Sequence, residues 1–411
     1  MRHRTAIVIG GGIGGLTAAV ALECRGWEVT VLERAAALEP VGAGIGLAPN
    51  AQRALDAIGA GDAVRAGAAR QAAGEIRLPG GRRLARTDNA AAVRRFGGPV
   101  LVVHRAELVG LLAARLPAGA VRTDAAAELV DMGETGAAGR PARVRLADGE
   151  ELSADLVVAA DGIHSAVRRT LFPGHPGPRY AGFTTWRLVV PAPDRPFVAH
   201  ETWGRGGLWG SLPLHDGRVY AYATAAVPPA GRAVDDERAE LLRRFGHWHH
   251  PVPALLAAAG PTAVLRNDVY TAAAPPPAFH RGRVALLGDA VHPMTPNLGQ
   301  GGCQAIEDAV VLAHEAAPDA DPAAALAAYT RQRLPRTMEV VRRAERIGRF
   351  TTWRSRPACA LRTAVLATHA RLTPDLALRT LDGIADWRPP AATYASGTRG
   401  TRTAAQREEH R

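Results

Sequence analysis

Three stretches of the sequence combine glycines with a carboxylate, a chemistry suited to holding a nucleotide. The first is Gly10-x-Gly12-x-x-Gly15, which follows the apolar run 6–9. The first glycine permits a tight turn, the second lets the backbone approach a pyrophosphate, and the third lets a helix pack close to a strand. Glu33 follows about 20 residues later, where a carboxylate accepts hydrogen bonds from a ribose. The pattern predicts a dinucleotide site, and the alternative is a glycine-rich turn without a ligand.

The other two stretches end later apolar runs. Asp161-Gly162 follows the run 156–160, and Gly288-Asp289 follows the run 283–287. Ligands of open α/β sheets bind at the carboxyl ends of the strands, so both aspartates are candidates for ligand contacts. The alternative for Asp161 is a helix N-cap, and the alternative for Asp289 is a cap of the following loop.

Strand and helix signals around these stretches indicate an α/β architecture. Residues 5–34 predict strand, helix and strand, which places the helix N-terminus at the phosphates. A signal peptide is excluded, because the apolar run is rich in glycine and leads straight into Glu33. The glycine-rich loop 41–47 suggests close approach to a flat or bulky group, with a mobile surface loop as the alternative. Further elements are a helix at 49–58, strands at 100–103, 119–131 and 142–148, and a helix at 107–116 with Arg105 at its mouth.

The middle of the chain has a different character. The segment 75–86 predicts a hairpin, and short aromatic-rich strands are predicted at 183–190, 197–203, 207–214 and 219–227. They indicate an antiparallel sheet in a second domain, followed by helices at 235–248 and 252–259. Pro293 and Pro296 then exclude a helix before the one predicted at 303–316.

The C-terminal part reads as mainly helical. A long arginine-rich helix is predicted at 322–349, and its charges are interpreted as a solvated face. Another helical region covers 357–384, and the tail from 391 is polar and predicted to be disordered.

The composition excludes several classes of protein. The net charge is +11, yet the sequence of 411 residues contains no lysine, and its arginines are scattered without interleaved aromatic residues. This indicates a compositional bias rather than a nucleic-acid surface. The absence of lysine also excludes a Schiff-base or P-loop lysine. The chain lacks an unbroken apolar stretch of about 18 residues, so no membrane span is predicted.

The cysteines and histidines favour neither a disulfide frame nor a metal site. Cys24, Cys303 and Cys359 are odd in number and lack C-x-x-C spacing, which suits a reducing cytoplasm, the predicted location. The histidines of the HWHH segment 247–250 have no acidic or cysteine partner nearby, so a loop or helix end is predicted there and no metal.

The three glycine–carboxylate stretches, in this order and spacing, resemble the single-component flavoprotein aromatic hydroxylases typified by p-hydroxybenzoate and salicylate hydroxylases. The resemblance spans roughly 5–349, and the stretches VHRAEL and PNLGQGGCQAIEDA are similar to the salicylate hydroxylase-like branch. It implies an α/β fold with a Rossmann-type, glutathione reductase-like FAD-binding domain, an inserted α+β substrate domain of mostly antiparallel sheet, and C-terminal helices. The expected domains are 1–72, 98–178 and 270–345 for FAD, 73–97 and 179–269 for the substrate, 346–390 for the C-terminal helices, and 391–411 for the tail.

The resemblance implies FAD as a non-covalent cofactor and NADH or NADPH as a transient electron donor. The glycines of the first motif would hold the pyrophosphate, Glu33 and Arg34 the adenosine ribose, Arg105 the phosphate–ribityl part and Asp289 the ribityl chain. Asp161 would matter for FAD and for use of the nicotinamide nucleotide. The implied cofactor contacts are Gly10, Gly12, Gly14, Gly15, Glu33, Arg34, Gly44, Arg105, Asp161, Gly288, Asp289, Pro296, Gly299, Gln300, Gly301, Gly302 and Cys303.

The implied reaction is hydroxylation of an aromatic or heteroaromatic small molecule with O2, through a flavin C4a-hydroperoxide, by a monomer or homodimer. The sequence offers no obvious catalytic base. Candidates for lining the substrate are Trp186, Arg187, Trp209 and Tyr222, with ordinary core aromatics as the alternative.

Other readings remain beside this one. A related FAD enzyme catalysing epoxidation or Baeyer–Villiger insertion has the same motifs, and a non-catalytic nucleotide-binding module would need only the first of them. A flavin-dependent halogenase is disfavoured, because that family relies on an active-site lysine.

Overall fold

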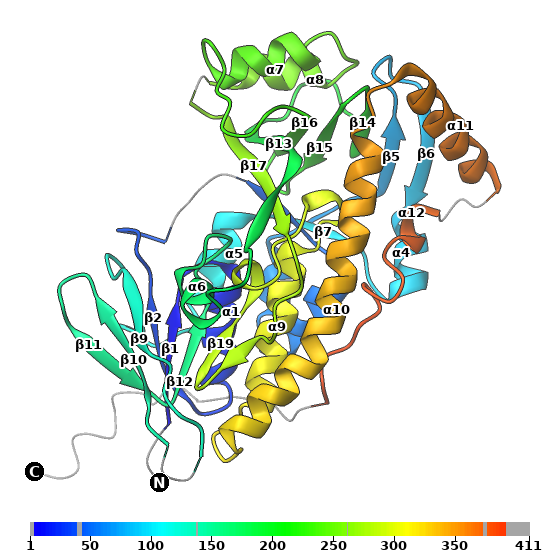
Figure 1. Ribbon diagram of the computed structural model, residues 1–411. Coiled ribbons are helices and arrows are strands. Elements are labelled where there is room, and N and C mark those ends of the chain that lie inside the picture. Colours follow the sequence, from blue (N-terminus) through cyan, green and yellow to red (C-terminus); the bar gives the residue numbers. More distant parts are fainter. Residues whose placement is uncertain (1–3, 39–42, 137–138, 261, 373–375, 392–411) are drawn as a thin grey trace, which may run out of the picture.

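A six-stranded sheet, parallel except at one edge, forms the centre of the half of the molecule that contains the N-terminus (Figure 1). The structure is a computed structural model and describes residues 4–38, 43–136, 139–260, 262–372 and 376–391. The strand order is β18 (His280–Arg281), β19 (Val284–Leu286), β12 (Leu156–Ala159), β1 (Thr5–Ile9), β2 (Glu28–Leu32) and β8 (Val121–Arg122). The strands β1, β12 and β19 are buried along nearly their whole length, which explains their unbroken apolar runs.

Helices and two small antiparallel sheets pack around this sheet into one apolar core. The small sheets are β9 (Ala127–Asp131), β10 (Ala142–Leu146) and β11 (Glu151–Ala154), and β3 (Gly44–Leu47), β7 (Leu101–His104) and β4 (Ala69–Arg70). The helices are α1 (Ile13–Glu23), α2 (Pro49–Ala57), α3 (Gly61–Ala66), α5 (Arg105–Ala113), α6 (Ala166–Leu171), α9 (Gly301–Glu315) and α10 (Pro322–Thr351). The loop predicted at 41–47 is a strand from Gly44 onwards, whereas Val41 and Gly42 lie outside the described residues.

A seven-stranded sheet forms the second half of the molecule, above the first in Figure 1. Its order is β17 (Leu265–Ala272), β13 (Pro178–Pro191), β16 (Arg218–Ala225), β15 (Gly207–Pro213), β14 (His200–Trp203), β5 (Ala73–Arg77) and β6 (Arg83–Asp88). Neighbours pair antiparallel, except that β14 and β5 pair in parallel. The predicted mixed fold with a mostly antiparallel second sheet is confirmed, and the hairpin β5–β6 joins that sheet from far upstream.

The two faces of this sheet have different neighbours. The back face carries Trp186, Trp209 and Ala223, and it is covered by α7 (Glu237–Phe245) and α8 (Val252–Ala258). The front face carries Arg187, Gly210 and Tyr222, which are register partners of one another. Tyr220, on the same face, packs with Ala43 and Val102 of the first half. The front face is therefore the one turned toward the Rossmann-type half.

The C-terminal region contains helices, as predicted. The structure has α11 (Arg356–Leu372) and α12 (Leu376–Arg379) within or next to the helical region predicted at 357–384. Leu378 and Ala385 pack against α4 (Asn89–Phe96), and the tail prediction falls largely outside the described residues. Within the described part of the chain, every helix is too short or too polar to span a membrane.

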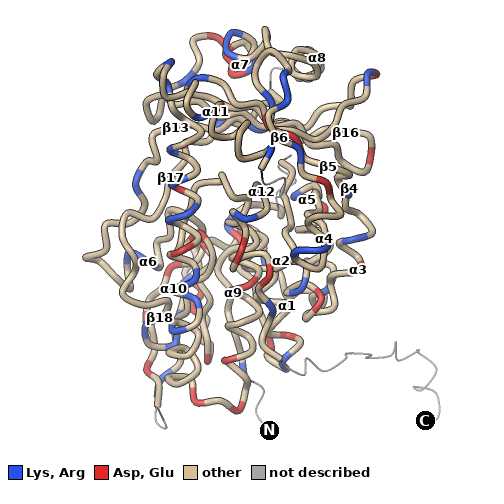
Figure 2. The backbone as a smooth tube through the Cα atoms, turned by 90° about the vertical axis from the view of Figure 1, so that its right-hand side faces the viewer, with Lys and Arg blue, Asp and Glu red and all other residues tan. Residues whose placement is uncertain are grey.

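Charged residues are interspersed over both halves of the molecule. Figure 2 shows arginines next to acidic residues along most elements rather than gathered on one face. Many are paired at the surface, as in the ion pairs of Arg145 with Glu151 and Arg243 with Asp235. The arrangement agrees with a compositional origin of the positive net charge.

Candidate active site

The carboxyl ends of four parallel strands bring the predicted ligand residues to one edge of the six-stranded sheet. Ile9 pairs with both Ala159 and Leu32, and Ala159 pairs with Leu286. The residues that follow these strands therefore emerge side by side. They are Gly10 to Gly12, Glu33, Asp161 and Asp289, from segments that are far apart in the sequence.

The glycines of the first turn have separable roles. Gly10 has a φ of +109°, and an added Cβ would lie 2.4 Å from the carbonyl oxygen of Ala160. At Gly15 an added Cβ would lie 1.9 Å from the carbonyl oxygen of Gly10, so this glycine lets α1 pack against the turn. At Gly12, the N-cap of α1, an added Cβ meets nothing within 4 Å. The turn thus leaves open space only where a phosphate would approach the helix N-terminus.

Glu33 closes the same turn from the end of β2. Its carboxylate accepts hydrogen bonds from the backbone N–H of Gly11 at 2.6 Å and of Ala35 at 2.9 Å. The remaining lone pairs leave room for a ribose hydroxyl. Arg34 and Arg105 are exposed, and the backbone N–H of Arg105 donates to the carbonyl of Ala43.

Asp161 is not the N-cap residue of the following helix, since Ser165 holds that position in α6. Its Oδ2 accepts a hydrogen bond from Val167 N–H at 3.2 Å, while its Oδ1 is buried without a partner among the described residues. Arg168 links this loop to the next one, because its guanidinium donates to the carbonyl oxygens of Ile163 and Ala290. Ser165 therefore occupies the N-cap position, Asp161 supports the first turn of α6 through Oδ2, and its buried Oδ1 remains an available acceptor.

Asp289 lies in a single 3-10 turn, η1 (Gly288–Ala290), and its side chain is exposed. Its carboxylate makes no hydrogen bond to another described residue. An added Cβ on Gly301, at the start of α9, would lie 3.9 Å from Asp289 Oδ1, so the carboxylate faces the space beside that helix N-terminus. The geometry favours the ligand role over the local cap.

We expect Asp289→Ala to weaken FAD binding by roughly tenfold or more, the scale of a hydrogen bond to a charged group. The melting temperature of the apoprotein should stay unchanged, because this carboxylate holds no part of the loop. FAD titration and thermal melting of one apoprotein preparation measure both quantities. A lower apoprotein melting temperature with native FAD affinity would instead show that Asp289 is a cap.

The loop before α9 approaches β3 closely. A short 3-10 turn, η2 (Pro296–Leu298), is present where the prolines were expected to exclude helix, and Gly299 then adopts a φ of +61°. An added Cβ on Gly302 would lie 2.6 Å from Ile45 Cδ1. Cys303 donates its thiol to the carbonyl of Gly46 at 3.5 Å, and burial raises the pKa of that thiol to about 12. The side chain therefore stays a neutral thiol. Gly44 likewise accommodates a ring: an added Cβ there would lie 2.4 Å from Tyr220.

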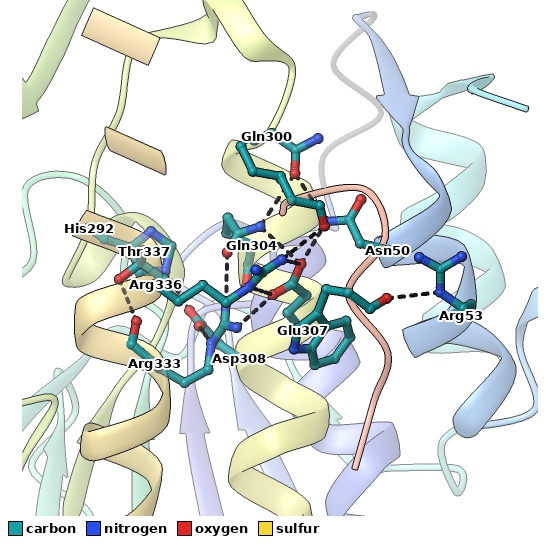
Figure 3. A network of polar contacts seen from close by, with 12 residues as sticks. Asn50, Arg53, His292, Gln300, Gln304, Glu307, Asp308, Arg333, Arg336 and Thr337 are labelled. Atoms are coloured by element: carbon teal, nitrogen blue, oxygen red, sulfur yellow. Dashed lines mark hydrogen bonds and ion pairs between the residues drawn. The ribbon is translucent and has the colours of Figure 1, made fainter. Parts of the chain in front are cut away.

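A buried charge network beneath this loop was missed by the sequence analysis (Figure 3). Arg333, on the helix whose charges were interpreted as solvated, has a side chain only 1% exposed. It forms ion pairs of 2.6 Å with both Glu307 and Asp308 of α9. His292 Nε2 lies 2.5 Å from Asp308 Oδ2. The solvated interpretation is wrong for Arg333, whose partners lie on another helix.

The front face of the seven-stranded sheet carries a second polar group. The Tyr222 hydroxyl donates to Glu201 Oε1 at 2.5 Å, and Trp203 Nε1 donates to Glu201 Oε2 at 2.8 Å. Burial, reinforced by Glu201, raises the pKa of Tyr222, which therefore stays a phenol. Arg187 is held by Asn267 at 2.9 Å. Glu201 was not among the sequence candidates, although its register with Gly210 places it on this face.

Two of the predicted substrate-lining residues belong elsewhere. Trp186 and Trp209 lie in the core between the back face and α7–α8, and their indole N–H groups donate to Glu237 and Ser211. They cannot line the front face, because neighbouring residues of a strand point to opposite sides. The alternative of ordinary core aromatics holds for both.

The edge fits FAD on three counts. It offers an open glycine turn at a helix N-terminus for the pyrophosphate, and free carboxylate acceptors at Asp161 and Asp289. It also buries the unpaired amide atoms Nε2 of Gln300 and Oδ1 of Asn50 close to the start of α9. Such a set matches a ligand with phosphates, hydroxyls and a polar ring. The fold and this edge define a flavin-dependent enzyme of the Rossmann type.

Comparison with known proteins shows to which family of flavin-dependent enzymes the chain belongs. The FAD binding domain family matches residues 3–344. Aurachin C monooxygenase/isomerase of Stigmatella aurantiaca is 40% identical over 364 residues, which cover 88% of this chain and 93% of that protein. The 3-amino-4-hydroxybenzoate 2-monooxygenase of Streptomyces cremeus is 39% identical over 354 residues, covering 83% and 86%. The structure of Klebsiella pneumoniae HpxO complexed with FAD and uric acid has a TM-score of 0.82 at 32% identity, covering 93% and 96%.

The chain belongs to the single-component FAD-dependent aromatic hydroxylases. It is therefore an FAD-dependent monooxygenase, as the resemblance implied.

Proposed function

We propose that the chain hydroxylates an aromatic or heteroaromatic small molecule that lies between the front face of the seven-stranded sheet and the start of α9. The observation that carries this proposal is the position of Tyr222, Glu201 and Arg187 on the one sheet face turned toward the FAD edge. NADH or NADPH would supply the electrons, in a cytoplasmic monomer or homodimer. Two of the relatives named above are, by name, an aurachin C monooxygenase/isomerase and a 3-amino-4-hydroxybenzoate 2-monooxygenase.

The bound FAD supplies the oxygen chemistry. The chain's part is to hold, orient and enclose the substrate. Tyr222 keeps its proton and donates a hydrogen bond to Glu201, so that the Glu201 side chain is fixed beside the ring of Tyr222. Gly210 makes this possible, because an added Cβ there would lie 2.1 Å from that ring. Tyr222 and Glu201 then offer a ring face and a hydrogen-bond acceptor to an aromatic substrate with an N–H or O–H group.

The test is NAD(P)H consumption under air with a panel of phenols, hydroxybenzoates, purines and quinolones, with hydroxylated product identified by mass. A substrate that raises NAD(P)H oxidation and gains one oxygen atom supports the proposal. Oxygen insertion into a ring C–C bond or epoxide formation would instead favour the Baeyer–Villiger or epoxidase alternative.

For the substrate found in this way, we expect Tyr222→Phe to raise KM by about tenfold, because Glu201 loses one of the two donors that fix it. FAD affinity should remain native. Trp209→Phe is the matched control on the back face, and it should leave KM unchanged. Equal KM effects of the two variants would remove the assignment of the front face to the substrate.

A further inference from the structure

Two adjacent side-chain amides near the start of α9 are buried but incompletely bonded. Gln300 is 1% exposed and Asn50 is 0% exposed. Nε2 of Gln300, a donor, and Oδ1 of Asn50, an acceptor, have no hydrogen-bond partner among the described residues. The amides are joined by the hydrogen bond from Asn50 Nδ2 to Gln300 Oε1 at 3.0 Å. A buried donor and a buried acceptor left unpaired point to a ligand that pairs with both.

The orientation of both amides is set by Glu307. Its Oε1 accepts hydrogen bonds from Asn50 Nδ2 at 2.6 Å and from Gln304 Nε2 at 3.0 Å. A carboxylate can only accept, so Asn50 must present its NH2 group to Glu307 and its oxygen elsewhere. The same NH2 group requires Gln300 to present its oxygen, which leaves Gln300 Nε2 free. Figure 3 shows the free atoms on the side of the network away from Arg333.

Two arginines of α10 keep Glu307 ionised. Arg333 and Arg336 contact Glu307 Oε2 at 2.6 and 2.8 Å, and Arg336 also donates to Oε1 at 2.9 Å. Burial alone raises the pKa of the Glu307 carboxyl, but the two guanidinium groups outweigh burial and bring that pKa below its ordinary value. A protonated Glu307 would be able to donate, and the amides would no longer have one defined orientation.

We propose that Arg333 and Arg336 are positioning residues for bound FAD: through Glu307 they orient Asn50 and Gln300 so that Gln300 Nε2–H and Asn50 Oδ1 bond the polar edge of the flavin ring. The pyrimidine half of the flavin offers carbonyl acceptors and a ring N–H donor, which match this pair. The free donor lies at the residue that precedes α9, a 15-residue helix whose N-terminus also attracts negative charge. The proposal concerns the cofactor and is independent of which substrate the enzyme takes.

The consequence is measurable on the flavin itself. Reduction places negative charge on the pyrimidine half, so a donor there binds the reduced form more strongly than the oxidised form. Gln300 therefore raises the reduction potential of bound FAD. Loss of the donor, or of the orientation that Glu307 imposes, should weaken FAD binding and lower that potential.

The experiment compares Gln300→Met, Glu307→Gln and Arg336→Gln with the native holoenzyme. We expect each variant to raise the FAD dissociation constant, by about tenfold for the first two, and to make the potential more negative. Glu339→Gln is the matched control, because Glu339 pairs with Arg342 and Arg343 at the surface of α10. It should leave both quantities native.

Two results would overturn the proposal. Native affinity and potential in Gln300→Met would show that the free amide does not meet the flavin. Lower thermal stability in Glu307→Gln and Arg336→Gln, with native affinity and potential, would show that the network only holds α9 and α10 together. Gln300→Met removes the unpaired donor together with the oxygen that accepts from Asn50 and Gln304, but it leaves the ion pairs of Glu307 in place. The test therefore stands even if a network variant fails to fold.

Discussion

A Gly12→Val variant is expected to keep its fold and to lose FAD binding entirely. The backbone of Gly12 has a φ of −77° and a ψ of −180°, which any residue can adopt. An added Cβ meets nothing within 4 Å in the protein, so the apoprotein has room for the side chain. That room lies at the N-terminus of α1, where the pyrophosphate must approach the backbone. Valine would fill it.

The measurements are FAD titration and thermal melting of the apoprotein. Gly15→Val is the control for a structural glycine, because its Cβ would lie 1.9 Å from the carbonyl oxygen of Gly10. That variant should lose stability as well as FAD. Gly12→Ala should fall between native protein and Gly12→Val in affinity. Native FAD affinity in Gly12→Val would mean that the pyrophosphate does not pass this turn.

The second large effect is expected for Arg333→Met, which should destabilise the protein by about 3–5 kcal/mol. The substitution removes the cation that pairs with two fully buried carboxylates, Glu307 and Asp308. Arg336 still contacts Glu307, so the larger loss falls on Asp308. Arg342→Met, at an exposed pair with Glu339, should cost no more than about 1 kcal/mol. Denaturant unfolding of both variants measures the difference. Equal losses of unfolding free energy in the two variants would contradict the expectation that a buried ion pair costs more to break than an exposed one.

The effect of Arg333→Met should depend on pH. Burial opposes ionisation of Asp308, but His292 and Arg333 prevail and lower its pKa to about 2. A carboxyl with a depressed pKa stabilises the fold above its unfolded pKa, and this stabilisation is lost as the pH falls toward the folded value. The gap in unfolding free energy between native protein and Arg333→Met should therefore narrow as the pH is lowered from about 4, near the ordinary pKa of an aspartate, toward about 2. A gap that widens on acidification would rule out this account.

The first βαβ unit was predictable because its signals are local. Each signal specifies a neighbouring piece of backbone. The signals are an apolar run, three glycines at fixed spacing, and a carboxylate about 20 residues later. The assembly of Asp161 and Asp289 with that turn also followed, because carboxyl ends of parallel strands meet at one edge. Which part of the cofactor each of these residues contacts is still a prediction.

The buried network was not predictable from the same pattern. Arg333 stands in an arginine-rich helix beside residues such as Arg342, and nothing local separates the buried arginine from the exposed one. Its partners, Glu307 and Asp308, lie on α9, so only the packing of the two helices reveals the pairs. The placement of Trp186 is a different kind of error. Trp186 and Arg187 are adjacent in a strand, so their side chains point to opposite faces of the sheet. The alternation of side chains alone therefore shows that the two residues cannot line the same site.

The parallel pairing of β14 with β5 has a consequence for biosynthesis. Residues 73–88 leave the ribosome long before residues 178–272, yet the two segments share one sheet. Until β14 emerges, the nascent hairpin β5–β6 exposes a strand edge able to pair with another chain. A translational pause between these segments should therefore favour aggregation, and a protein fragment of residues 179–269 alone would lack two of the seven strands.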